Sequence, residues 1–216
     1  VDPPFWAQHY LACDDVLIDG ITVDSRRHWV ADGLDIDSCH RVRIVNSTIQ
    51  SRDDSIALKT TSPRALKDVH IENCRLSATA NAIKTGTETT GSFENIVVEN
   101  VSISDTKIAG IALLAVDGGV MRNVRISNIT MENVKSPVFL RLGNRARDHL
   151  SSKKGIHRTG KGAAPTEKTK GDRLGVGSMR DIVIRNITAT SAGIVPQNRK
   201  LGVDGASPIS GIEGHP

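Results

Sequence analysis

A five-residue phrase recurs along the chain and constrains its fold more than any other feature. Each copy begins with Val or Ile and alternates apolar with polar residues, and every copy but the first ends in Asn. Successive copies start 26, 27, 27, 28 and 58 residues apart, at residues 16–20, 42–46, 69–73, 96–100, 124–128 and 182–186. Period-2 alternation of β-branched residues is typical of a strand with one buried face, and no helical periodicity competes with it.

A second alternating segment follows the phrase within most repeats, at residues 34–37, 56–59, 81–84, 111–114 and 138–141. Aligning these segments predicts an apolar column of Ile36, Leu58, Ile83, Leu113 and Leu140. The mostly polar column beside it is Asp37, Lys59, Lys84, Leu114 and Arg141. Short strands at a period of about 27 residues cannot bury their apolar faces alone, so they stack on their neighbours. We therefore predict an all-β fold, a parallel β-helix (solenoid), with residues 1–216 forming a single domain.

The ends of the chain carry no capping sequence, so we expect it to be a fragment of a longer helix. The recurring Asn at the last position of the phrase is expected to form a ladder from coil to coil, because turn-forming side-chain amides stack in this way.

Most of the positive charge lies in one segment, a predicted loop insertion at about residues 143–178. It carries nine Lys and Arg against three acidic residues, whereas the remaining chain is negative by two and the whole chain is +4. No aromatic residue interleaves these cations, as a stacking platform for single-stranded nucleic acid requires, so we expect no nucleic-acid partner. No apolar run approaches the roughly 20 residues of a membrane helix, and we expect no membrane partner.

Three aspartates are candidates for acid–base chemistry. Asp32 and Asp54 each lie four residues before a matching position of the apolar column, which places them one coil, about 4.8 Å, apart. Asp53 immediately precedes Asp54, so its side chain should point in a different direction from that of Asp54. Clustered carboxylates repel one another and raise each other's pKa, as an acid paired with a base requires. Glycoside hydrolysis needs such a pair, although Asp32 and Asp53 would also suit ordinary turns.

Residues 32–39 (DGLDIDSC) and 52–59 (RDDSIALK) resemble glycoside hydrolase family 28, the polygalacturonases and related pectin-degrading enzymes. Segments 108–112 and 139–144 are similar to a bacterial branch of that family. The resemblance implies a right-handed parallel β-helix and an inverting hydrolase without a cofactor or metal. It implies Asp53 as the general acid, with Asp32 and Asp54 together activating the attacking water. It further implies a secreted or periplasmic protein, with pectin, an acidic plant cell-wall polysaccharide, as substrate, and we expect a monomer.

Three of the family's motifs are altered. Val30 and Ala31 precede Asp32 where the family has Asn-Thr. The region of the family's Gly-His-Gly reads Thr-Ala-Asn at residues 79–81, and that of its Arg-Ile-Lys reads Ala-Leu-Leu at residues 112–114. Rhamnogalacturonan or an exo-acting mode is therefore as compatible with the sequence as homogalacturonan.

Other side chains could bind substrate in place of the missing motifs. A uronate needs a cationic partner, and Arg is suited to bidentate carboxylate binding. Trp29 could stack on a sugar ring or simply cover a coil edge, and the cations could equally be solvated surface charges. The candidate substrate-binding residues are Arg52, Lys59, Asn81, Lys84, Arg141 and Trp29.

Two other functions remain open at this point. A pectic polysaccharide lyase would use calcium and a basic Arg or Lys, and the Asp-Asp context argues against it. A non-catalytic solenoid that binds carbohydrate or serves as a stalk would tolerate the missing motifs. Chelation and ultraviolet-absorbing products would identify a lyase, and Asp53→Asn would separate an enzyme from a binding protein.

Overall fold

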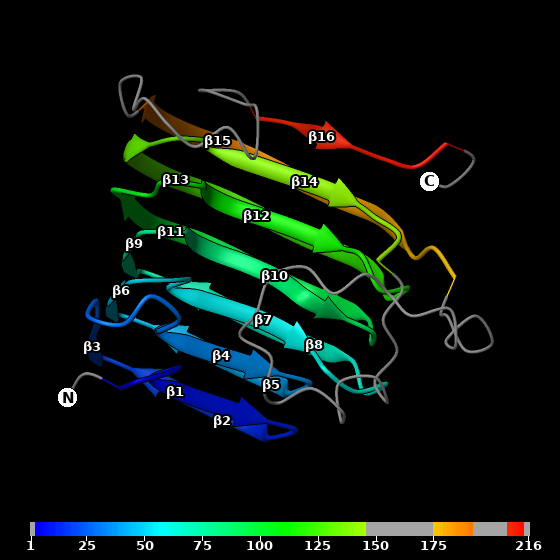
Figure 1. Ribbon diagram of the computed structural model, residues 1–216, viewed down its shortest axis with the longest axis horizontal. Helices are drawn as coiled ribbons and strands as arrows, with labels where there is room; N and C mark the ends of the chain where they lie inside the picture. The colour runs from blue at the N-terminus through cyan, green and yellow to red at the C-terminus, as the bar shows by residue number, and fades with distance from the viewer. Residues whose placement is uncertain (1–2, 146–174, 192–206, 214–216) are drawn as a thin grey trace.

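The computed structural model describes residues 3–145, 175–191 and 207–213, and every regular element in these ranges is a β-strand. The strands form coils that stack from the N-terminal end toward the C-terminal end (Figure 1). Most of the predicted basic insertion lies outside the described residues. The described part of the chain contains no helix with the length and apolarity needed to cross a membrane.

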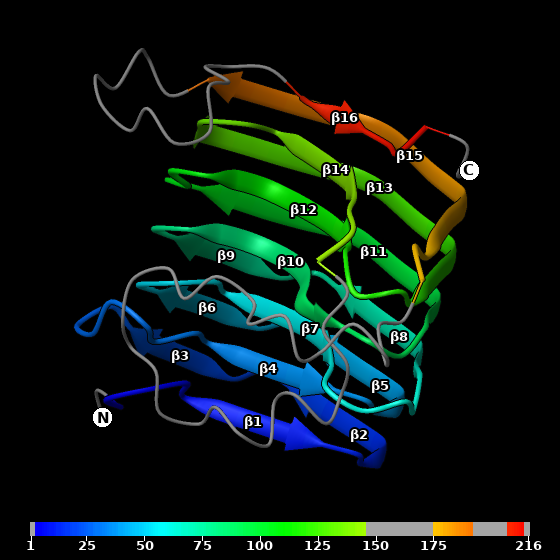
Figure 2. The ribbon, with the colours of Figure 1, turned by 45° about the vertical axis from the view of Figure 1, so that its right-hand side comes forward.

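One face of the stack is a parallel sheet of seven strands, each contributed by a successive coil. Figure 2 shows this face toward the viewer. Its strands in spatial order are β1 (Gln8–Leu11), β4 (Leu34–Asp37), β7 (Ile56–Thr60), β10 (Asn81–Thr89), β12 (Ala109–Ala115), β14 (Val138–Leu142) and β16 (Ile209–Ser210).

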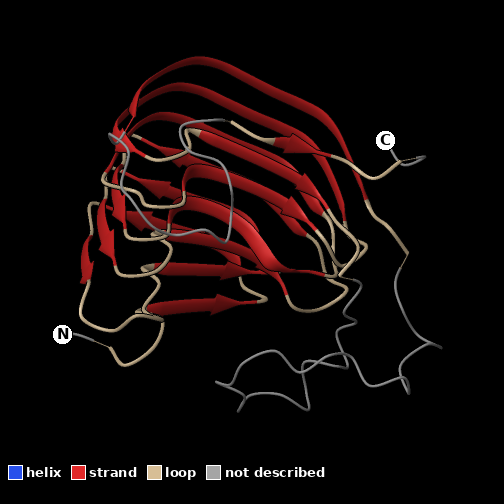
Figure 3. Ribbon diagram, turned by 45° about the horizontal axis from the view of Figure 1, so that its top comes forward, coloured by secondary structure: helices blue, strands red, loops and turns tan. Residues whose placement is uncertain are grey.

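The opposite face is a second parallel sheet, in which short strands of the early coils merge into long bent strands of the later ones (Figure 3). The short strands are β2 (Asp14–Asp19), β5 (His40–Val45) and β8 (Leu66–Glu72), with β3 (Thr22–Ser25), β6 (Thr48–Ser51) and β9 (Arg75–Ala78) beside them. Strands β8 and β9 both pair with β11 (Phe93–Ser104), which is followed by β13 (Val120–Val134) and β15 (Ser178–Ser191). The predicted all-β parallel solenoid is confirmed.

The recurring phrase is in register from coil to coil, as its alignment predicts. Val16 pairs with Val42, Val42 with Val69, and the pairing continues through Ile96 and Val124. Val124 then pairs directly with Ile182. The last spacing of 58 residues, about two periods, is therefore a single step of the stack, and the additional residues lie between two neighbouring rungs.

The predicted apolar column is correct at four positions and wrong at β10. Ile36 pairs with Leu58, and Leu113 pairs with Leu140. Ile83, however, pairs with Ile56 and Ile111 rather than with Leu58 and Leu113. The shift is two residues, so the same face of β10 stays buried and the core accepts either register. As a result Lys84 lies beside Ala57 and Ala112, two positions away from the column of Lys59.

The predicted asparagine ladder is present along an exposed corner of the stack between Asn100, Asn128 and Asn186, whereas Asn46 donates instead to Asp19. Asn128 Nδ2 donates to Asn100 Oδ1 at 3.1 Å, and Asn186 Nδ2 donates to Asn128 Oδ1 at 3.1 Å. All five Asn of the phrase have positive φ, between 52° and 56°, a left-handed conformation that Asn tolerates better than most residues. The backbone turn therefore explains why Asn recurs at this corner.

Candidate active site

The three predicted aspartates meet on one side of the solenoid. Asp32 lies in the loop that enters β4, and Asp53 and Asp54 lie in the equivalent loop one coil later. The backbone N–H of Asp54 donates to Oδ1 of Asp32 at 2.9 Å. One carboxylate oxygen from each of the three residues lies within 4.8 Å of the other two. Asp32 and Asp54 are buried, whereas Asp53 is half-buried.

Gly33 allows these two loops to approach each other. Its N–H donates to the carbonyl of Asp54 at 2.9 Å. A Cβ at this position would lie 2.4 Å from Cγ2 of Ile49 and 2.5 Å from the carbonyl oxygen of Ser55. Only glycine fits between the coils here, and the close contact fixes Asp32 directly against Asp54.

The next coil holds both oxygens of Asp54. Asn81 donates to Asp54 Oδ1 from its side-chain Nδ2 at 2.7 Å and from its backbone N–H at 3.2 Å. Lys84 Nζ lies 2.8 Å from Asp54 Oδ2. Burial by itself lowers the pKa of Lys84, but the adjacent Asp54 outweighs it and the net shift is upward. A charged ammonium and two N–H donors therefore stabilise a negative charge on Asp54.

Lys59 forms an ion pair with Asp35, a carboxylate that is not among the site residues predicted from the sequence. Its Nζ lies 3.0 Å from Asp35 Oδ1 and 3.7 Å from Asp32 Oδ2 and from Glu88 Oε2. The ammonium also lies 3.8 Å above the centroid of the Trp6 ring, a cation–π contact. Asp35 could have been found from the sequence, since it alternates with Asp37 along the predicted strand, but nothing local indicates that Trp6 reaches Lys59.

The environment keeps protons on this cluster at a pH where an exposed Asp is ionised. Burial, followed by repulsion from Asp35 and Asp54, raises the pKa of Asp32 to about 7. Burial, followed by repulsion from Asp54 and Asp32, raises the pKa of Asp53 to about 7. Burial also raises the pKa of Asp35 to about 6, against the opposing effect of Lys59. An acid and a base that operate near neutral pH are the chemical outcome of this arrangement.

The remaining predicted residues are exposed. Trp29 is 69% exposed, in the loop that carries Asp32, and Arg52 is exposed beside Asp53. Arg141 is exposed on β14. No hydrogen bond or ion pair between described residues joins any of these three side chains to the aspartates, and their role in substrate binding stays a prediction.

Two groups of side chains in the described ranges are spaced closely enough to hold a metal ion. One is the aspartate cluster, and the other is His70, Glu72 and Glu99 on the opposite sheet. In the second group His70 Nε2 already lies 2.8 Å from Glu99 Oε1. In the aspartate cluster, Lys59 Nζ lies 3.7 Å from Asp32 Oδ2 and Lys84 Nζ lies 2.8 Å from Asp54 Oδ2. The donor set there is therefore partly neutralised by the protein itself.

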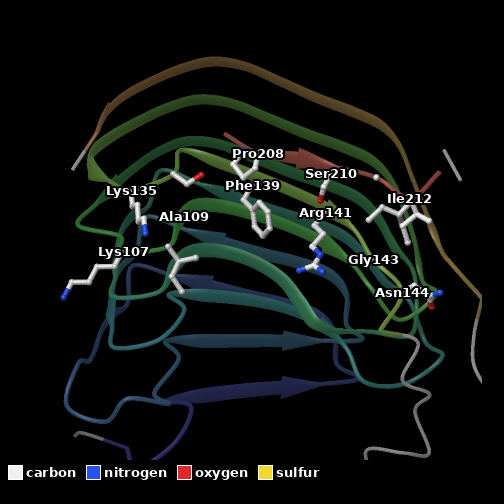
Figure 4. A pocket seen from close by; sticks show the side chains of 14 residues that line it. Lys107, Ala109, Lys135, Phe139, Arg141, Gly143, Asn144, Pro208, Ser210 and Ile212 are labelled. Atoms are coloured by element: carbon white, nitrogen blue, oxygen red, sulfur yellow. The ribbon is translucent and has the colours of Figure 1, made fainter. Parts of the chain in front are cut away.

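A cleft leads away from the aspartate cluster along the seven-stranded sheet. A hollow of about 470 Å³ is lined by Asn81 and Lys84 at one end and by Phe139 and Arg141 at the other. A neighbouring hollow of about 540 Å³ shares Phe139 and Arg141 and continues toward β16 (Figure 4). The two residues that hold Asp54 thus stand at the start of an elongated groove, a shape suited to a polymer chain.

Comparisons with known proteins agree with this site and fold. Residues 2–144, about two thirds of the chain, match the model of glycosyl hydrolases family 28. A polygalacturonase of Cochliobolus carbonum is 28% identical over 130 residues, which cover 57% of this chain and 34% of that protein. An endo-polygalacturonase of Pectobacterium parmentieri is 31% identical over 115 residues, covering 50% of this chain and 27% of that protein.

Solved structures share the fold. A family 28 exopolygalacturonase of Yersinia enterocolitica superposes with a TM-score of 0.67 at 18% identity, covering 89% of this chain and 32% of that one. A polygalacturonase from Erwinia carotovora ssp. carotovora gives 0.63 at 19% identity, covering 88% and 51%. The matched segments span about a third or less of the curated relatives. The stacked aspartates agree with the family match. Because that match covers residues 2–144, this chain belongs to glycosyl hydrolases family 28.

Proposed function

We propose that the protein hydrolyses glycosidic bonds in pectic, uronic-acid-containing polysaccharide. The observation that carries the proposal is the hydrogen bond from the Asp54 N–H to Asp32, which holds two buried carboxylates beside the half-buried Asp53. Membership of family 28 and the similarity to polygalacturonases support the same reaction and substrate class. As a corollary, we propose that the protein acts outside the cytoplasm, where such a polymer is found.

Asp53 is the general acid in this proposal. Its pKa of about 7 leaves it largely protonated in mildly acidic solution, and its partial exposure gives its proton access to the leaving oxygen. Asp32 and Asp54 hold the attacking water. Their oxygens lie within 4.8 Å, so one water molecule at ordinary hydrogen-bond distance from each can bridge them.

In this proposal the reaction is a single displacement that inverts the configuration at the anomeric carbon. The carboxylate oxygens are closer together than the roughly 6.5–9.5 Å typical of inverting enzymes, so spacing alone does not favour inversion. The positions of Asp32 and Asp54, the two proposed bases, do favour inversion. Both oxygens of Asp54 are engaged by Asn81 and Lys84, and Asp32 is only 3% exposed. Buried carboxylates whose oxygens are already engaged are better suited to orienting a small water molecule than to attacking the anomeric carbon of a sugar.

The substrate class follows from charge as well as from the family. A uronate polymer is a polyanion, and cationic side chains line the groove that starts at Lys84, the partner of Asp54. Ala112 and Leu114 on the floor of the groove are neutral, so the sugars above β12 need not carry a carboxylate. Homogalacturonan and rhamnogalacturonan, and endo- and exo-acting modes, therefore all remain within the proposal.

The test is release of reducing ends from polygalacturonate and from rhamnogalacturonan. Asp53→Asn should lower kcat by about 10²- to 10⁴-fold, the usual contribution of a general acid. Asp15→Asn, which removes an exposed carboxylate paired with Arg41 on the opposite sheet, is the matched control and should keep full activity. Binding of the polymer without product from any variant would instead indicate a carbohydrate-binding solenoid.

Two further measurements separate the mechanisms. Nuclear magnetic resonance of the first-formed product should show an anomeric configuration opposite to that of the substrate, and a retained configuration would contradict the assignment of Asp32 and Asp54. Activity should survive chelation without products that absorb in the ultraviolet. Loss of activity on chelation, together with such absorbance, would identify a lyase.

A further inference from the structure

An aromatic ring and a guanidinium lie side by side in the groove beyond the aspartates. Phe139 and Arg141 are two residues apart on β14, so their side chains leave the same face of the sheet about 6.6 Å apart along the strand. Figure 4 shows both side chains directed into the same hollow. Ring faces and guanidinium groups are the two kinds of side-chain surface that bind the apolar face and the carboxylate of a uronic acid.

Arg141 differs from Lys84 and Arg145, the other two cations that line the hollow next to Asp54's partners, because its charge is not neutralised. Lys84 is paired with Asp54, and Arg145 is paired with Asp117. Arg145 also donates to the carbonyl oxygen of Thr87 at 2.7 Å. Within the described ranges, by contrast, no carboxylate forms an ion pair with Arg141. Its guanidinium is exposed and available to an anion from solution.

The register gives the separation between this pair and the aspartates. Lys84, which holds Asp54, pairs with Ala112, and Ala112 pairs with Phe139. Phe139 is therefore two coils from Lys84 and three coils from the coil of Asp54, or about 10 Å and about 14 Å at 4.8 Å per coil. The short side chain of Ala112 leaves the intervening floor low, and the hollow that joins Lys84 to Phe139 is continuous. A single sugar cannot span this distance, whereas an oligosaccharide can.

We propose that Phe139 and Arg141 form a distal subsite that binds one uronic-acid residue of the polysaccharide whose scissile bond lies at the aspartates. The sugar ring stacks on Phe139, and its carboxylate accepts two hydrogen bonds from Arg141. This subsite rests on the proposed hydrolase function and places a requirement for negative charge three coils away from the coil of Asp53 and Asp54.

The test compares oligogalacturonides of increasing length. Arg141→Gln should lower the ratio of kcat/KM on the hexamer to kcat/KM on the shortest cleaved oligomer by at least tenfold. Methyl-esterifying the hexamer should lower the same ratio in the wild type and remove its dependence on Arg141. Arg125→Gln, an exposed arginine on the opposite sheet that donates to Asn123, is the control and should keep the wild-type ratio. An unchanged ratio in Arg141→Gln would overturn the subsite.

A binding measurement separates failure of the subsite from failure of the hydrolase. In the Asp53→Asn background, calorimetric titration with hexagalacturonate should show binding at least tenfold weaker when Arg141→Gln or Phe139→Leu is added. If binding depends on Arg141 but the wild type cleaves nothing, the subsite stands and the hydrolase proposal fails. If the wild type cleaves the hexamer and binding ignores both substitutions, the subsite alone fails. Absence of both binding and cleavage would overturn both proposals.

Discussion

The backbone N–H of Asp54 donates a hydrogen bond of 2.9 Å to the side chain of Asp32, a residue 22 positions earlier in the chain. The contact exists because one coil of the solenoid lies directly on the next, with Gly33 allowing the closest approach. The repeating backbone thus does more than support the site. Stacking of equivalent loops is itself what brings the carboxylates together.

The proposed roles predict a bell-shaped dependence of kcat/KM on pH, with its maximum near pH 7. Asp53 must keep its proton, so activity falls as the pH rises above its pKa of about 7. Asp32 must lose its proton, so activity falls as the pH drops below its own pKa of about 7. The two limbs describe the cluster as a whole because its carboxylates titrate together. Kinetics between pH 4 and 10 measure the profile, and full activity retained at pH 9 would contradict it.

Asp53→Asn should stabilise the fold at high pH although it lowers kcat. A carboxyl with a raised folded-state pKa contributes stability below its unfolded value near 3.8, and this contribution is lost as the pH rises through about 7. Removing the charge at pH 8 should therefore raise stability by on the order of 1 kcal/mol after solvent screening, or about 2–4 °C in Tm. At pH 4 the effect should vanish. Thermal unfolding at both pH values measures this difference.

The control residue, Asp15, has a pKa shifted in the opposite direction from that of Asp53. The hydrogen-bonded Arg41 lowers the pKa of Asp15, so Asp15→Asn removes a favourable interaction and should not stabilise the protein at pH 8. Equal stabilisation by both substitutions would mean that general surface charge, and not repulsion within the cluster, is responsible.

Lys84→Met should lower kcat and also displace the pH profile. Lys84 lowers the pKa of Asp53 against the larger effects of burial and repulsion, so its removal should move the alkaline limb to higher pH. We expect a loss of about 10- to 100-fold in kcat, since the base Asp54 also loses its ammonium partner. Lys67→Met on the opposite sheet should leave the profile in place. A lower kcat with an unmoved alkaline limb would indicate a purely structural role for Lys84.

Gly33→Ala should destabilise the protein by about 1–3 kcal/mol, the usual cost of overpacking a close contact. The added Cβ would meet Ile49 and the backbone of Ser55 at 2.4 and 2.5 Å. Because the coils must separate to admit it, Asp32 should move relative to Asp54 and activity should fall as well. Gly175→Ala is the matched control, since a Cβ there has no neighbour within 4 Å. Denaturant unfolding of both variants measures the difference, and equal stability would refute the packing argument.

The sequence by itself determined the solenoid and the stacking of its acidic loops. The recurring phrase fixes which residue faces the core at each coil, and Val16 through Ile182 pair as its alignment predicts. Asp32 and Asp54 occupy the same place relative to Ile36 and Leu58, which do pair. A local pattern with a regular period was sufficient, because each coil contacts only its neighbours.

Only the tertiary structure decided which charges belong to the site. A register shift of two residues in β10 places Lys84 beside Ala57, and from there it reaches Asp54. That shift keeps the same side chains in the core, so the alternation of apolar and polar residues cannot reveal it. Asp35 and Trp6 likewise engage Lys59 from earlier coils. Partners of charged side chains depend on distances between coils, and the repeat specifies only the order in which those coils stack.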